Sequence, residues 1–296
     1  MTSPFRILCA VDASLPAAAA FEQALAMSVQ RGAQLVVVHA VSKNTPYSWG
    51  AVERVTVLAA LRERAEALKV PVRVRTQQGD TAEVVLLHAS AQSPDLIVLG
   101  SHEPIGLARF RFGSIADQVV RGATCPVLLV PAATAQATPS FRRVVCAVDL
   151  SSRSPAMISD ASRFVQGVER FALLHIVHDS AERRPRRAAS ELASAAARDA
   201  CQQLRSMLET QNVQADVIVT ASSTSADEEV LRVASEITAD LIVMGATRST
   251  GLRRRFLGST AIRASRRSPI PVLILPAVHA KRTPSPLDQA ALGWAA

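Results

Sequence analysis

FRILCAVDAS, at Phe5–Ser14, is a short apolar run ending near an aspartate, and it returns as FRRVVCAVDLSS at Phe141–Ser152. Three further segments recur in the same order. They are LVVVHAV at Leu35–Val41 with FALLHIV at Phe171–Val177, PDLIVLGS at Pro94–Ser101 with ADLIVMGA at Ala239–Ala246, and FGSIADQVVRGATCPVLLVPA from Phe112 with LGSTAIRASRRSPIPVLILPA from Leu257. A repeat of this length fixes the architecture first: the chain contains one unit written twice.

The repeat predicts two domains, at residues 1–133 and 141–278. Residues 134–140 between them include a proline, small residues and no charge, which is typical of a linker. Residues 279–296 contain two prolines and are expected to form a loosely held tail. Each copy is long enough to bury a core of its own.

Within each copy, short apolar runs rich in β-branched residues alternate with amphipathic stretches of helical length. In copy one we expect strands at residues 6–11, 34–41, 72–76, 96–100 and 127–131, and helices over 16–30, 51–68, 81–92 and from about 114. Strands that are apolar on both faces and separated by helices indicate a parallel sheet covered on both sides. Right-handed crossovers favour the strand order 3-2-1-4-5. The predicted fold class is α/β, with two tandem doubly wound domains of five parallel strands each.

Ligands of such sheets bind beyond the carboxyl ends of the strands, at the point where the winding reverses, here between strands 1 and 4. Glycines allow backbone amides to approach a phosphate, a helix N-terminus favours an anion, and an aspartate can accept hydrogen bonds from a base or ribose. The alternative is that the serines only cap helices and the glycines only serve turns. Recurrence in both copies favours a binding site. The residues at these places are Asp12, Gly100, Gly113 and Ser114 in copy one, and Asp149, Gly245, Gly258 and Ser259 in copy two.

These same residues carry a family resemblance. VDxS after strand 1, LIVxG(S/A) at strand 4, a Gly-Ser pair and PVLxxP at strand 5 together resemble the universal stress protein family in its tandem form, over nearly the whole of both copies. The resemblance implies that ATP, with or without Mg²⁺, binds at the eight residues above. It also implies that Ala40 and Ile176 line an adenine pocket, and that the two domains pair through their last strands. A homodimer beyond this internal pair is a further expectation.

The chain departs from the family's G-x2-G-x9-G-(S/T) pattern at the middle glycine, which is Glu103 in copy one and Arg248 in copy two. A glutamate repels phosphate, whereas the charge of an arginine suits it. If only one copy binds ATP, we therefore expect it to be copy two, with Arg253–Arg255 adding positive charge to the same loop. That arginine run is equally explained as a solvated surface.

Composition narrows the function further. The net charge is +8, and every basic residue between positions 140 and 278 is an arginine. Such charge suits binding of nucleic acid, anionic lipid or phosphorylated small molecules. Nucleic-acid binding is the less favoured interpretation, because no feature other than the charge supports it. No apolar run has the length of a membrane helix and no signal-peptide pattern opens the chain, so a cytoplasmic location is expected. The cysteines and histidines lack metal-ligand spacing.

The sequence thus predicts a cytoplasmic stress-response protein that binds adenine nucleotide and signals through its conformation or its partners. Two alternatives stay open: a nucleotide-independent interaction protein and a slow ATPase. GxxxxGK[ST] and GxGxxG after the first strand are absent, and no residue is assigned a catalytic role.

Overall fold

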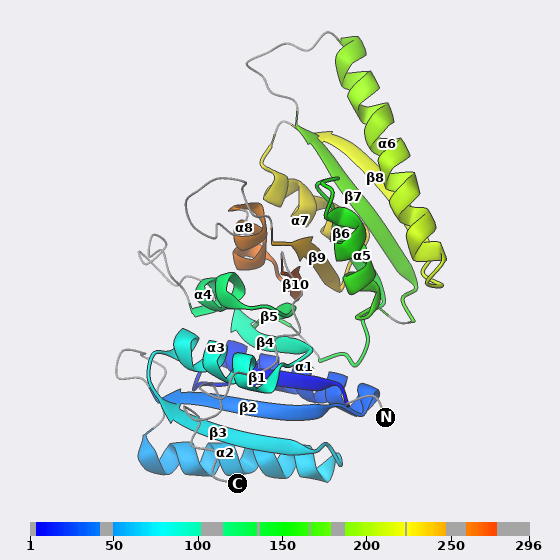
Figure 1. Ribbon diagram of the computed structural model, residues 1–296. Helices are drawn as coiled ribbons and strands as arrows, with labels where there is room; N and C mark the ends of the chain where they lie inside the picture. The colour runs from blue at the N-terminus through cyan, green and yellow to red at the C-terminus, as the bar shows by residue number, and fades with distance from the viewer. Residues whose placement is uncertain are drawn as a thin grey trace. The chain divides into compact units, whose positions relative to one another are not determined.

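The computed structural model describes residues 4–41, 50–101, 115–134, 137–165, 167–178, 187–222, 224–246 and 259–276 (Figure 1). They divide into two compact units, one up to Pro139 and the other from Ser140 onward. We call them unit 1 and unit 2; they hold copy one and copy two.

Unit 1 alternates strands and helices as the sequence predicts. Its elements are β1 (Arg6–Ala10), α1 (Leu15–Arg31), β2 (Gln34–Val41), α2 (Ala51–Ala67), β3 (Val72–Gln78), α3 (Thr81–Gln92), β4 (Leu96–Ser101), α4 (Ile115–Gly122) and β5 (Val127–Pro131). β3 runs two residues beyond the predicted end, because Gln77 and Gln78 continue the pairing with β2. Because β3 is an edge strand and faces solvent on one side, polar residues such as these can still belong to it.

Unit 2 repeats the order with different lengths. Its elements are β6 (Arg143–Ala147), α5 (Ser154–Ser162), β7 (Arg170–His178), α6 (Arg187–Glu209), β8 (Ala215–Ser222), α7 (Ala226–Glu236), β9 (Leu241–Gly245), α8 (Ser259–Arg267) and β10 (Val272–Leu275). The first helix has 9 residues here against 17 in unit 1.

Each unit contains a five-stranded sheet in which every described pairing is parallel. The order is β3-β2-β1-β4-β5 in unit 1 and β8-β7-β6-β9-β10 in unit 2. Both are the predicted order 3-2-1-4-5, and the fold class is confirmed. The winding reverses between β1 and β4, and between β6 and β9.

Helices cover both faces of each sheet. In unit 1, α1 packs on β1, β4 and β5, and α3 packs on β2 and α4. In unit 2, α6 lies along β8 and α7 lies beside α8 (Figure 1). The central strands are therefore apolar on both faces: Ile7, Leu8 and Cys9 of β1 have no exposed surface, and neither do Val144, Val145 and Cys146 of β6.

Local sequence signals begin and end the helices of unit 1. Ser14 precedes α1 and accepts a hydrogen bond from the amide of Ala17 at 3.3 Å. Asp80 does the same for α3, from the amides of Ala82 and Glu83. Gly32 ends α1 in the left-handed conformation, with φ 59°, which glycine adopts without steric cost. In unit 2, α5 follows Arg153, whose side chain makes no capping bond.

Candidate functional site

The candidate site of each unit is the edge of the sheet where the winding reverses. Cys9 pairs with Val98, so Asp12 and Gly100 follow shortly after on neighbouring strands of unit 1. Ala147 pairs with Met244, which brings Asp149 and Gly245 together in the same way in unit 2. The parallel sheet thus places each predicted aspartate beside its predicted glycine at a carboxyl edge.

In unit 1 the aspartate is built into the start of α1. Oδ1 of Asp12 accepts hydrogen bonds from the amide of Ser14 at 2.9 Å and from its hydroxyl at 2.5 Å. The same hydroxyl caps α1 through the amide of Ala17. Asp12 is half-buried, and it orients the capping serine.

Gly100 is packed against the backbone of α1. A Cβ atom at this position would lie 2.5 Å from the carbonyl carbon of Pro16 and 2.7 Å from the amide nitrogen of Ala17. Any side chain would therefore push against main chain that has no freedom to rotate away. The first turn of α1 fills this space beside β4.

In unit 2 the aspartate is exposed. Oδ1 of Asp149 accepts from the amide of Ser151 at 3.0 Å and from the hydroxyl of Ser154 at 3.2 Å. Desolvation pushes the pKa of Asp149 up, but these hydrogen bonds outweigh it and hold the pKa below its ordinary value. Asp149 is thus an ionised acceptor that solvent reaches. Leu150, directly after it, has φ 55°, a conformation that costs a non-glycine residue steric energy.

Side chains, not backbone, stand next to the glycine of unit 2. A Cβ atom at Gly245 would lie 2.8 Å from Sδ and 3.8 Å from Cγ of Met157 on α5. Nη2 of Arg153 donates to the carbonyl of Ala246 at 3.3 Å, which links the start of α5 to the residue after β9. The sequence reasoning missed Arg153. The signal was present: copy two has two more residues between its aspartate and the following proline than copy one, from Asp149 to Pro155.

In each unit, a histidine on the second strand bonds to the backbone carbonyl of the residue that precedes the aspartate. Nδ1 of His39 lies 2.9 Å from the carbonyl of Val11, and Nδ1 of His175 lies 2.9 Å from the carbonyl of Val148. A carbonyl only accepts, so each Nδ1 carries the proton. Burial lowers the pKa of His39. Both rings fix the backbone just before the aspartates.

The adenine-pocket residues lie at the carboxyl ends of the second strands. Ala40 is buried and pairs with Gln77 of β3, and Ile176 is half-buried and pairs with Thr220 of β8. The other predicted residues lie outside the described part of the chain, namely Glu103, Gly113 and Ser114 in copy one and Arg248, Arg253–Arg255 and Gly258 in copy two. Ser259 begins α8, and its side chain is not described.

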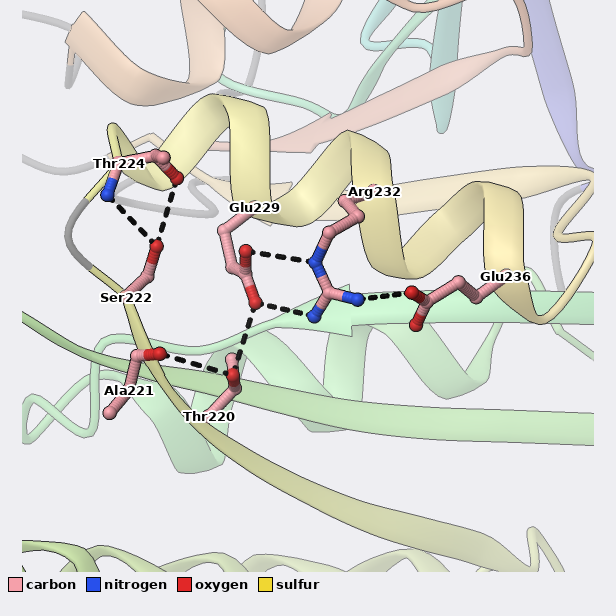
Figure 2. Close-up of polar contacts among 7 residues, drawn as sticks. All are labelled: Thr220, Ala221, Ser222, Thr224, Glu229, Arg232 and Glu236. Carbon is pink, nitrogen blue, oxygen red and sulfur yellow. Dashed lines mark hydrogen bonds and ion pairs between the residues drawn. The ribbon is translucent and has the colours of Figure 1, made fainter.

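A polar cluster surrounds Glu229 of α7 (Figure 2) and includes Thr220 of β8, the residue that pairs with Ile176. Glu229 accepts from Thr220 at 3.1 Å and from Nε and Nη2 of Arg232 at 3.0 and 2.6 Å, while Arg232 also pairs with Glu236. The side chain of Glu229 is only 8% exposed. Hydrogen bonding from Arg232 holds the pKa of Glu229 below its ordinary value, so the cluster fastens α7 to β8.

The described residues show neither a metal site nor a membrane-spanning helix. They contain no group of three or more His, Cys, Asp or Glu side chains arranged to hold a metal ion. No helix within these residues is both long and apolar enough to cross a bilayer.

The model of the universal stress protein family matches residues 5–131 and again residues 140–276. The chain belongs to this family. It carries the family's domain twice, and the matched segments coincide with the two copies.

Individual relatives agree with a tandem form. The universal stress protein in QAH/OAS sulfhydrylase 3'region of Thermus aquaticus is 35% identical over 133 residues, which are 42% of this chain and 96% of that protein. A universal stress protein of Methanocaldococcus jannaschii is 34% identical over 73 residues, which are 25% of this chain and 43% of that protein. The solved structure of a universal stress protein from Archaeoglobus fulgidus covers 93% of this chain with a TM-score of 0.66, at 17% identity, and shares its fold.

Proposed function

We propose that this universal stress protein binds adenine nucleotide, as ATP, in the unit 2 crevice between the ends of β6 and β9. It acts in the cytoplasm as a sensor or signalling protein of the stress response. Asp149 accepts hydrogen bonds from the ribose or base, Ile176 packs on the adenine, and Gly245 admits the chain of phosphates. Arg248, Gly258 and Ser259 complete the phosphate site as the sequence predicts.

The difference between the two crevices carries this proposal. In unit 1 the space beside Gly100 is filled by the backbone of Pro16 and Ala17. In unit 2 a Cβ atom at the matching glycine, Gly245, would meet the flexible side chain of Met157. Side chains rotate aside at small cost, whereas a helix turn does not. Unit 2 therefore has the crevice that can open for a ligand.

The role proposed here is binding and not turnover. The described groups supply acceptors, a cation and glycine, which hold a nucleotide. Any Mg²⁺ would arrive with the phosphates, and Asp149, ionised and exposed, is the described carboxylate that fits it.

The test is to purify the full chain, release any bound small molecules by denaturation and identify them, and then to titrate the protein with ATP by calorimetry. We expect ATP or ADP in the released fraction, or saturable binding. Gly258→Val should abolish binding, whereas Gly113→Val, the matched change in copy one, should leave it intact. No nucleotide in the preparation and no binding at millimolar ATP would refute the proposal, and loss only with Gly113→Val would move the site to copy one.

A second candidate is a nucleotide-independent interaction protein. Unit 1 favours it, because apolar side chains on two helices face solvent: Leu15 is 80% exposed, Val52 83% and Val55 68%. Val52 and Val55 lie three residues apart on one face of α2, and neighbouring exposed apolar residues are typical of contact sites. A chain that binds no nucleotide yet forms a defined complex lost on Val52→Asp would support this candidate.

A further inference from the structure

In unit 2 the connection after β6 carries a cation that the matching connection of copy one lacks. Arg153 stands directly before α5, and its side chain reaches the carbonyl of Ala246, just after β9. The corresponding connection in copy one, Asp12 to Pro16, contains no charged residue after the aspartate. The longer connection in copy two passes through Leu150 in the left-handed conformation and carries Arg153 to this place.

Arg153 lacks the partner that other arginines of unit 2 have. Arg142 pairs with Glu169, Arg170 with Asp216 and Arg263 with Asp227. Among the described residues, no carboxylate lies within ion-pair distance of Arg153. The sequence from Thr247 to Gly258, which continues from Ala246, contains no acidic residue. The positive charge of Arg153 therefore has only a neutral carbonyl as its acceptor in this part of the structure.

The bond to Ala246 is readily exchanged. At 3.3 Å it is long for a hydrogen bond from a guanidinium, and it uses one of five N–H donors. Phosphate oxygens bind a guanidinium through two parallel, charge-assisted bonds and are stronger acceptors than a peptide carbonyl. A phosphate entering beside Gly245 would replace Ala246 as the partner of Arg153.

We infer that Arg153 is a specificity-determining residue, which contacts the phosphates of the bound nucleotide and leaves the carbonyl of Ala246 to do so. The inference rests on the proposed function, nucleotide binding in unit 2. The crevice then has a negative acceptor, Asp149, and a positive donor, Arg153. A nucleotide matches this polarity with a sugar that donates and phosphates that accept.

The competing explanation is that Arg153 has only a structural role, as a strut that links the start of α5 to the end of β9. The two roles differ in what they do to ligands without phosphate. A phosphate contact affects ATP and leaves adenosine alone, whereas a strut shapes the crevice for both.

The experiment measures the dissociation constants of ATP and adenosine by calorimetry for the wild-type full chain and for Arg153→Gln, Arg153→Lys and Arg170→Gln. Arg170→Gln is the matched control, because it removes one arginine charge from the start of β7, at the opposite end of the same sheet. We expect Arg153→Gln to weaken ATP roughly ten- to a hundredfold, with adenosine unchanged. Arg153→Lys should restore part of the loss, since it keeps the charge but not the paired geometry. Arg170→Gln should change neither ligand.

The outcomes separate the claims. If wild-type protein binds neither ligand, the proposed function fails and the inference falls with it. If wild-type protein binds ATP and Arg153→Gln binds it equally well, only the role of Arg153 is refuted. An equal loss of ATP and adenosine identifies the strut and also overturns the inference.

Discussion

Asp12 and Asp149 stand at matched positions and are held by different partners. Ser14 donates to Asp12 and caps α1, so the carboxylate of copy one is part of a helix start. Asp149 accepts from Ser151 and Ser154 and remains exposed. A repeated residue is therefore weak evidence for a repeated role, because its neighbours decide whether a ligand can reach it.

The two strand-end glycines give a matched test of this difference. Gly100→Ala should lower the free energy of unfolding of unit 1 by about 2 kcal/mol, because the new methyl group meets backbone. Gly245→Ala should cost unit 2 less than about 1 kcal/mol, because the side chain of Met157 can turn away. Hydrogen exchange of peptides from β4 and β9, followed by mass spectrometry, reports each unit separately. Equal losses in the two units would show that the crevices are closed to the same degree.

Among single residues, the sequence predicted those that occur at matching positions in both copies. The aspartates and glycines stood out because both copies carry them after matching apolar strands. Arg153 did not, because it lies in an extension with no counterpart in copy one and its reach depends on the backbone turn at Leu150. The tight packing of Gly100 against Pro16 was equally hidden, since it joins residues far apart in the chain.

At the scale of elements, the two copies hold their last two helices together by different means. In unit 1, α3 and α4 approach so closely that a Cβ atom at Gly122 would lie 2.4 Å from Leu86. In unit 2, Asp227 of α7 lies 2.7 Å from Nε of Arg263 and 3.1 Å from Nη1 of Arg267, both on α8. The side chain of Asp227 is only 1% exposed. Copy one has Ala82 at the position of Asp227, so this ionic link is particular to unit 2.

Removing that link should destabilise unit 2. Asp227→Asn should lower the free energy of unfolding of unit 2 by about 2 kcal/mol. The loss is smaller than for a fully buried ion pair, because solvent screens the half-exposed arginines. Desolvation raises the pKa of Asp227, but hydrogen bonds from Arg263 and Ser225 outweigh it and lower the pKa below 3.8. The stabilisation is therefore complete above pH 3.8 and is lost as the pH falls through the lowered pKa.

Urea denaturation at pH 7 and at pH 3 measures this effect, and Ala82→Ser, at the matching position of copy one, is the control. The stability difference between the wild type and Asp227→Asn should be smaller at pH 3 than at pH 7. A difference that stays constant with pH would mean that the carboxylate charge of Asp227 does not hold the helices.

Helices and strands themselves were predictable because their signals are local. Ser14, Gly32 and Asp80 mark helix ends in unit 1, and runs of Val, Ile and Leu mark strands. The end of β3 was predicted too early, since its last residues, Gln77 and Gln78, pair with β2 through their backbone. The ionic link between α7 and α8 was not predicted, because charges spaced along two separate helices reveal nothing about which pairs meet.

At the scale of the whole molecule, one fold serves two differently stabilised units. In unit 1 the backbone of α1 packs against Gly100, whereas in unit 2 the side chain of Met157 lies against Gly245. Duplication allows one copy to keep a ligand site while the other changes. The proposed function therefore predicts that a ligand stabilises one unit and not the other.

The cysteines make this measurable, because each unit has a buried one on its first strand. Cys9 and Cys146 have no exposed surface, and burial raises the pKa of both, for Cys146 to about 12. A thiol reagent reaches either cysteine only when its unit opens, and a ligand that binds only the folded unit lowers the open population by a factor of one plus the ratio of the ligand concentration to Kd. At saturating ATP, alkylation of Cys146 in mild urea should slow about tenfold or more, and alkylation of Cys9 should not change. Mass spectrometry of the two peptides reads both rates from one sample. Protection of Cys9 alone would assign the nucleotide to copy one. Protection of neither cysteine would contradict the proposed binding of ATP.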